Sequence, residues 1–131
     1  MIAINFTVAV EPIPQPRPRF SKFGGVYFSK EITEYKAKIS QVAQATMQKL
    51  QPLTGDLSAV IRLYRKFKRS SRRYGDCDNH AKAICDALNK IVYADDSQIV
   101  RCVVEKFTDK ENPRVEVEIL EIDEWNFSIC K

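Results

Sequence analysis

The sequence predicts a single α/β domain (α+β in its connectivity) over residues 1–131, with a mixed β-sheet and two main helices packed on it. Segments that alternate apolar and polar residues predict strands with one buried face. Two longer segments repeat apolar residues at helical spacing. The 131 residues suffice for one hydrophobic core, and no repeat or long linker divides them.

The first segment, residues 2–10, is a predicted strand whose apolar side chains share one face: Ile2, Ile4, Phe6, Val8 and Val10. Four prolines then occur within residues 12–18, which excludes a helix and predicts an extended backbone for residues 11–19. Gly24–Gly25 predicts a turn, and residues 26–28 a short strand after it.

Residues 30–50 form the first predicted helix, with Ser29 as its cap and Pro52 and Gly55 ending it. Its apolar stripe comprises Ile32, Tyr35, Ile39, Val42 and Leu50. A strand follows at 57–65, where Leu57, Ala59, Ile61 and Leu63 share a face.

The second predicted helix begins near Asp78 and runs to about Ile91. Its apolar stripe comprises Ala81, Ile84, Cys85, Leu88 and Val92. Residues 97–107 and 114–122 are two more predicted strands. Because only a short polar connector separates them, we expect an antiparallel hairpin.

Composition narrows the class of protein. No apolar run approaches the ~20 residues that span a bilayer, and the alternating N-terminus resembles a strand rather than a signal peptide. We therefore expect no membrane association and a cytoplasmic location. The four cysteines form no CxxC pair and His80 is the one histidine, which argues against zinc and favours reduced thiols.

The net charge is +4, but residues 62–73 hold seven basic residues and no acid. Such local charge suits nucleic-acid binding, although a solvated loop without a partner would show the same pattern. Two aromatic residues, Phe67 and Tyr74, either stack on unpaired bases or anchor the loop. Arg17 and Arg19, on the proline-rich segment, are further candidates for phosphate contacts, the alternative being a polyproline ligand. The predicted DNA-binding residues are Arg17, Arg19, Arg65, Lys66, Lys68, Arg69, Arg72, Arg73 and Tyr74.

Acidic residues gather directly after the basic segment. Asp76 and Asp78 stand where the second helix begins, and Asp78, Lys82 and Asp86 lie at about 0°, 40° and 80° around it, beside the apolar stripe. This row can line a cleft. Capping by Asp78, or a surface ion pair with Lys82, is the simpler alternative. Asp95–Asp96 follow the helix, and a cluster of acids repels itself unless a cation neutralises it. Carboxylates favour Mg²⁺ over zinc.

The combined pattern resembles the RusA family of Holliday-junction resolvases (crossover junction endodeoxyribonucleases). Asp76-x-Asp-Asn-x-x-Lys82 is followed by Asp86-Ala-Leu-Asn and Asp95-Asp-Ser-Gln98, and upstream by Pro14-x-Pro-Arg-Pro-Arg-Phe20. The resemblance implies a RusA-like fold from about Val8 to Ile119. It implies Asp76, Asp78 and Asp96 as metal ligands and Lys82 as the catalytic lysine, with Asp86 and Asp95 in supporting positions.

The resemblance also implies a homodimer that resolves four-way junctions by paired symmetric nicks in DNA recombination and repair. Mg²⁺ would be the cofactor, with Mn²⁺ as a substitute, and the origin bacterial or prophage. A nuclease for other branched DNA (flaps or forks) and a DNA-binding module without catalysis remain alternatives. A calcium loop is excluded because Ala81 and Ala87 stand where glycine and glutamate are required. A DxD-type nucleotide-sugar transferase is disfavoured because no Gly-rich turn is present.

Overall fold

A computed structural model describes residues 2–16, 19–20, 22, 24, 26–27 and 29–123, with the backbone alone for 19–20 and 26–27. Arg17 and the side chain of Arg19 therefore lie outside the described residues, as does the tail from Glu124. The elements follow the order β1 (Ala3–Val8), β2 (Arg19–Phe20), β3 (Val26–Tyr27), α1 (Lys30–Met47), β4 (Leu57–Arg65), α2 (Cys77–Ala87), the short 3₁₀ helix η1 (Asp96–Gln98), β5 (Ile99–Thr108) and β6 (Arg114–Glu121).

Four strands form one mixed sheet in the order β1–β6–β4–β5. β5 runs parallel to β4, while β6 is antiparallel to both β4 and β1. The parallel pair follows from the helical connection, because a crossover through α2 returns the chain in the same direction. The predicted mixed sheet is therefore confirmed.

The predicted hairpin between the last two strands is wrong, because β4 lies between β5 and β6. The connector 109–113 crosses the end of β4, where the Asp109 N–H donates to the Arg65 carbonyl at 2.8 Å. Two strand spacings are only about 9.6 Å, which five residues span easily. A short connector is thus compatible with two arrangements, an antiparallel hairpin of β5 with β6 and a crossing over the end of β4. The second arrangement buries β4 between two partner strands.

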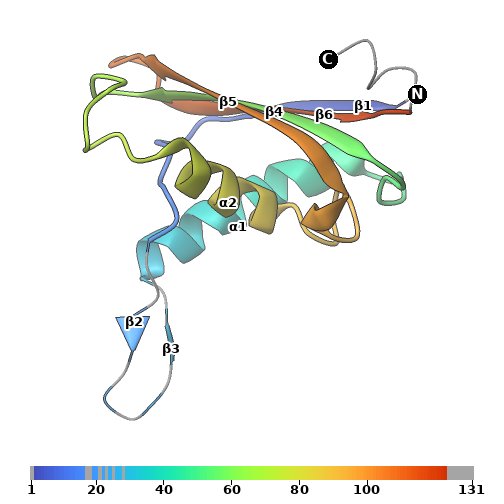
Figure 1. The fold of residues 1–131 in the computed structure, drawn as a ribbon, viewed down its shortest axis with the longest axis horizontal. Helices are drawn as coiled ribbons and strands as arrows, with labels where there is room; N and C mark the ends of the chain where they lie inside the picture. The colour runs from blue at the N-terminus through green and yellow to red at the C-terminus, as the bar shows by residue number, and fades with distance from the viewer. Residues whose placement is uncertain are drawn as a thin grey trace.

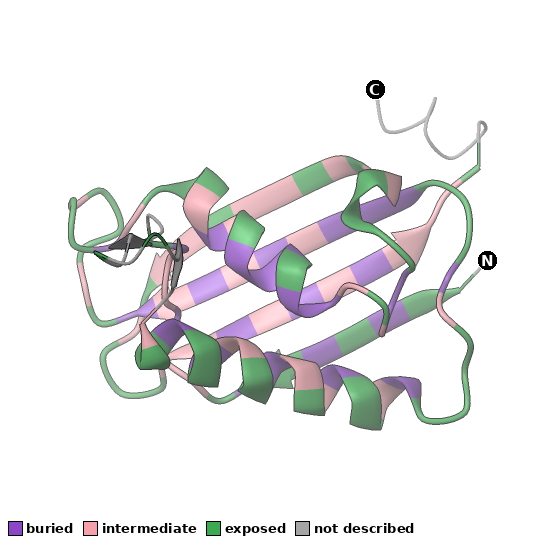
Figure 2. Cartoon of the chain, turned by 90° about the horizontal axis from the view of Figure 1, so that it is seen from below, coloured by how far each residue is buried: buried purple, intermediate pink, exposed green. Residues whose placement is uncertain are grey.

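Both helices cover the same face of the sheet, as Figures 1 and 2 show. α1 packs on the β1 side and α2 on the β5 side, and the two helices contact each other. The inward residues of β4 are fully buried beneath them: Leu57, Ala59, Ile61 and Leu63. The ribbon β2–β3 projects away from the sheet on the side of the helices (Figure 1).

The helices differ from their predicted bounds at their ends. Ser29 occupies the N-cap position of α1 but its side chain forms no capping hydrogen bond. α1 ends at Met47, so Leu50 lies beyond it and is 50% exposed, while Ala43 and Met47 complete the buried stripe. α2 ends at Ala87, four residues before the predicted end, because residues 88–93 turn back toward the chain near Leu53.

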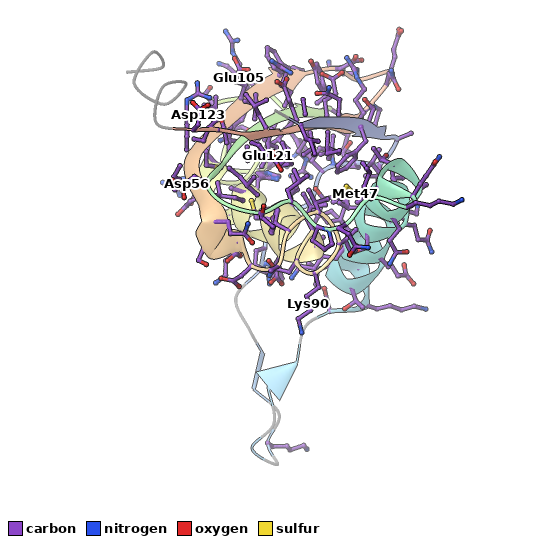
Figure 3. All side chains as sticks on the ribbon, turned by 90° about the vertical axis from the view of Figure 1, so that its right-hand side faces the viewer. Met47, Asp56, Lys90, Glu105, Glu121 and Asp123 are labelled. Carbon is purple, nitrogen blue, oxygen red and sulfur yellow. The ribbon has the colours of Figure 1, made fainter. Side chains whose placement is uncertain are left out.

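The basic segment follows the C-terminal end of β4, whereas the opposite end of the sheet, which Figure 3 faces, carries Asp56, Glu121 and Asp123. At that opposite end the Ile122 N–H donates to the Asp56 carbonyl at 3.0 Å, which extends the pairing of β6 with β4. Among the described helices, none combines the length and the apolar character that crossing a bilayer requires.

Candidate active site

The start of α2 positions the first two acids. Asp76 is the N-cap residue, with an extended backbone (φ −77°, ψ 146°), but its carboxylate forms no capping hydrogen bond. The preceding Gly75 has φ +95°, and a Cβ there would lie 2.7 Å from Pro14 Cγ. A side chain at residue 75 would therefore strain the backbone and push against the proline-rich segment. This glycine allows the loop to enter the helix tightly.

A cavity of about 510 Å³ lies between α2, η1 and β5. Asp78 and Lys82 enter it from α2, and Asp96 enters it from η1. All three are exposed, and none forms an ion pair with another described residue. The remaining lining residues are mainly apolar: Cys77, Ala81, Cys85, Ile99, Cys102 and Val104. Two carboxylates and one lysine thus lie together on an otherwise apolar surface.

Three of the predicted acids lie outside this lining: Asp76, Asp86 and Asp95. Asp76 is exposed at the mouth of α2 and does not line the cavity. Asp86 accepts a hydrogen bond from Lys36 of α1 at 2.9 Å and lies within 3.4 Å of the Asn89 amide. The predicted row Asp78–Lys82–Asp86 therefore divides, because its last member is drawn toward α1. Asp86 ties the two helices together rather than facing the cavity.

Asp95 shapes the turn that presents Asp96. Its carboxylate accepts from the Ser97 N–H at 3.1 Å, and the Gln98 side chain accepts from the Asp95 N–H at 3.1 Å, which completes a capping box. Hydrogen bonds from the Ser97 side chain and backbone hold the pKa of Asp95 below its ordinary value. Gln98 also donates to the carbonyls of Leu53 and Gly55. The turn is therefore fixed to the rest of the chain, and Asp95 has a structural role in it.

The donor set fits a hard divalent cation with few protein ligands. Among the described residues, no three Asp, Glu, His or Cys side chains approach closely enough to enclose a metal by themselves. Mg²⁺ does not require such a cage, since it is commonly held by one or two carboxylates, several waters and a substrate phosphate. Asp78 and Asp96, which line the same cavity, could supply such a pair of carboxylates.

The basic loop between β4 and α2 exposes five of its cations: Lys66, Lys68, Arg69, Arg72 and Arg73. Two turns shape it, with the Ser71 N–H donating to the Lys68 carbonyl and the Tyr74 N–H to the Ser71 carbonyl. The Thr108 hydroxyl donates to the Phe67 carbonyl and fastens the loop to β5. Exposed cations on a fastened loop are suited to contact phosphates.

Arg65 and Tyr74 are the exceptions, and their prediction as DNA contacts is wrong. Arg65 is 9% exposed; its Nε donates to Glu11 at 3.0 Å, and its Nη1 donates to the carbonyls of Arg73 and Tyr74. Tyr74 is fully buried, and its hydroxyl lies within 2.8 Å of the Leu63 and Phe107 carbonyls. Both residues are committed to the protein, so the anchoring alternative is confirmed for Tyr74.

The buried side chain of His80 supports the same basic loop from the interior of the protein. It is fully buried, and its Nε2 lies 2.6 Å from the Tyr74 carbonyl, so Nε2 carries a proton and donates it to that carbonyl. Burial is the main cause that lowers its pKa to about 4. The Gln15 N–H donates to the Asn79 carbonyl next to it at 3.0 Å, so the proline-rich segment also braces α2.

Sequence reasoning missed Glu11, Gln15 and His80 as supports of the site. Glu11 and Gln15 lie in a segment notable for prolines, and the structure reveals their partners only through contacts distant along the chain. The single histidine within an apolar helix face was the one available signal for His80.

Comparison with known proteins adds a family to this geometry. Residues 9–120 match the family described as "Endodeoxyribonuclease RusA". The chain is also 36% identical, over 141 residues, to the "Uncharacterized protein YqaN" of Bacillus subtilis (strain 168), a match that covers 93% of this chain and 99% of that protein. The matched region contains the basic loop, α2 and η1.

Proposed function

The chain belongs to the RusA endodeoxyribonuclease family, and from that premise we propose that it is a Mg²⁺-dependent nuclease that resolves Holliday junctions by paired symmetric nicks. The observation that carries the proposal is the meeting of Asp78, Lys82 and Asp96 in one cavity beside an exposed basic loop. The two acids come from separate elements, which is the arrangement expected of a site rather than of a solvated helix face. Recombination and repair are the processes that such an activity would serve.

The acids and the lysine have different roles in the proposed reaction. Asp78 and Asp96 hold the cation, with Asp76 as a further ligand by family resemblance. Bound Mg²⁺ lowers the pKa of a water ligand and stabilises charge on the phosphate. Lys82 lies one helical turn from Asp78 and places a fixed positive charge beside the reacting phosphate. Asp95 and Gln98 hold the turn that keeps Asp96 in the cavity.

The basic loop delivers DNA to these residues. Its exposed cations give affinity for phosphates without reading sequence, and the loop continues through Gly75 directly into Asp76. The apolar wall of the cavity excludes water from one side of the reacting group, which strengthens the charge interactions there. Two such sites in a homodimer would give the symmetric pair of nicks.

The test is cleavage of a mobile four-way DNA junction with Mg²⁺, Mn²⁺ or EDTA, beside flap, fork and duplex substrates. We expect paired nicks at the junction with either metal and no nicks with EDTA. Preferential cutting of flaps or forks would identify those structures, rather than four-way junctions, as the substrate. Junction binding without any cutting would make the chain a non-catalytic DNA-binding module.

Asp78→Asn is the matched variant for the metal site, because it preserves shape and removes one charge. We expect it to abolish cutting and to leave junction binding nearly unchanged. Retained cutting would overturn the assignment of the cavity. Sedimentation of the protein alone, and of its complex with a junction, tests the proposed dimer.

A further inference from the structure

Sulfur is concentrated at the candidate site. Three of the four cysteines line its cavity, and all three are free thiols. Cys77 and Cys102 are exposed, whereas Cys85 is 8% exposed. The fourth cysteine, Cys130, lies outside the described residues. Neither the metal site nor the DNA-binding loop uses these thiols.

Two of the thiols line the cavity from neighbouring elements, a helix and the edge strand. Cys85 lies on α2 and Cys102 on β5, and these elements pack together. Cys102 pairs with Ala59 of β4, which is fully buried under the helices, so Cys102 points to the same side of the sheet. An interaction between the two thiols lowers the pKa of Cys102 to about 7.

This geometry combines an accessible thiol with a sheltered partner. A thiolate, rather than a thiol, reacts with peroxides, and reactivity follows both thiolate character and exposure. Cys102 is exposed and able to meet an oxidant, while Cys85 stands behind it as a resolving thiol. Cys77 is exposed too, but no thiol interaction with it is found among the described residues.

We propose that Cys85 and Cys102 form a reversible disulfide when the protein meets hydrogen peroxide, and that this bond switches off the adjoining site. In the first step the Cys102 sulfur attacks the peroxide, so that an S–O bond forms, the O–O bond breaks and hydroxide leaves as water after taking a proton. In the second step the Cys85 sulfur attacks Cys102, so that the S–S bond forms and the S–O bond breaks. The second water carries away the Cys85 proton, and peroxide accepts the two electrons that the thiols lose.

The bond would alter the cavity because it ties one wall to the other. A disulfide holds its sulfurs at about 2.05 Å and requires a particular torsion about them, so both side chains must leave their free positions. Cys85 lies one turn from Lys82 and two from Asp78 on the face that lines the cavity. A misplacement of about 1 Å costs about 100-fold in rate at a catalytic site. This second part rests on the proposed nuclease function.

The first experiment measures the bond itself in the full chain. The variant Cys77→Ser/Cys130→Ser retains Cys85 and Cys102 alone, and intact mass is recorded before and after peroxide. We expect a loss of about 2 Da, the mass of two hydrogens, in a monomeric chain, with recovery after dithiothreitol. Adding Cys85→Ser should remove the loss and leave oxygen adducts on Cys102. No 2 Da loss, or the same loss after Cys85→Ser, would overturn the disulfide.

The second experiment compares junction cleavage by the oxidised and reduced forms of the same two-cysteine variant. If the disulfide switches off the site, cleavage should be about 100-fold slower after oxidation and should recover with dithiothreitol. Equal cleavage with the disulfide complete would overturn it. If the reduced parent protein, with all four cysteines, cuts no DNA, the nuclease proposal fails, while the mass measurement still decides the disulfide. Mn²⁺ binding to the two forms, followed by electron paramagnetic resonance, then decides whether the bond closes the cavity.

Discussion

Arg65 joins three parts of the chain, and replacing it tests whether the basic loop is held from inside. Arg65→Met keeps the length of the side chain and its apolar contacts but removes the guanidinium. The lost contacts are Nε to Glu11 at 3.0 Å, and Nη1 to the carbonyls of Arg73 at 3.2 Å and Tyr74 at 2.7 Å. The variant therefore disconnects the proline-rich segment, β4 and the loop from one another.

The expected loss follows from burial. The Arg65 side chain is 11% exposed and that of Glu11 is 32% exposed, so the pair is neither fully buried nor fully solvated. Breaking a buried pair costs about 3–5 kcal/mol, and water that reaches the abandoned Glu11 reduces this cost. The two carbonyls lose a charged donor, and bonds to charged groups contribute about 1.5–3 kcal/mol each. We expect the free energy of unfolding to fall by about 3 kcal/mol.

Urea unfolding measures this change, with an unaltered slope against denaturant as the check that the folded and unfolded states remain comparable. Arg72→Met is the matched control, because Arg72 lies on the same loop and is exposed; its cost should stay within about 0.5 kcal/mol. A loss below about 1 kcal/mol for Arg65→Met would refute the anchoring role. It would return Arg65 to the group of residues available for DNA.

Three further predictions address protonation, the metal site and DNA affinity. The pKa of His80 falls from an ordinary value of about 6.5 to about 4 on folding, so the unfolded chain binds the proton first as the pH drops. The contribution of His80 to the free energy of unfolding is therefore fully present above pH 6.5 and declines by about 3 kcal/mol as the pH drops to 4. His80→Gln, which keeps a donor for the Tyr74 carbonyl, should lose this part of the pH dependence in urea unfolding, and an unchanged profile would contradict it. Asp96→Asn should slow junction cleavage by about 100-fold or more in single-turnover assays. Asp95→Asn still accepts the Ser97 hydrogen bond, so it should slow cleavage by less than about tenfold. Equal losses of rate would argue against a metal-binding role for Asp96 and a structural role for Asp95. Arg72→Gln/Arg73→Gln should reduce the slope of log affinity against log salt by about 0.9 for each phosphate contact removed, and a slope identical to the parent protein's would exclude both residues from the DNA interface.

Local pattern was sufficient for much of the fold. β4 runs from Leu57 to Arg65, as its alternation predicts, since its apolar residues fall on one face between Gly55 and the basic segment. The pairing of the strands was beyond local pattern. β6 and β5 are close in sequence but separated by β4, and only the burial of whole strands distinguishes this order from a hairpin.

The candidate site, like the fold, was predictable from the sequence only in part. Asp78 and Lys82 are one turn apart, so helical geometry alone brings them together, and Asp96 joins them through the family resemblance. Asp86 could not be placed from sequence because its partner Lys36 belongs to the other helix. Arg65 and Tyr74 look like exposed residues of a basic loop, since charge and aromaticity are visible in a sequence while burial by Glu11 and β5 is not.

The order of strands also bears on how the protein is made. β6 is synthesised after the other strands of its sheet, yet it is the strand that joins β1 to the rest of the sheet. Until residues 114–121 leave the ribosome, β1 has no strand partner and one edge of β4 stays open, while chains emerge at only about 5–20 residues per second. A nascent chain would therefore hold the basic loop, α2 and η1 without a completed sheet beneath them. Folding of this sheet depends on pairing between β1 and β6, which are far apart in the sequence, so assembly of the site is expected to wait until β6 has been synthesised.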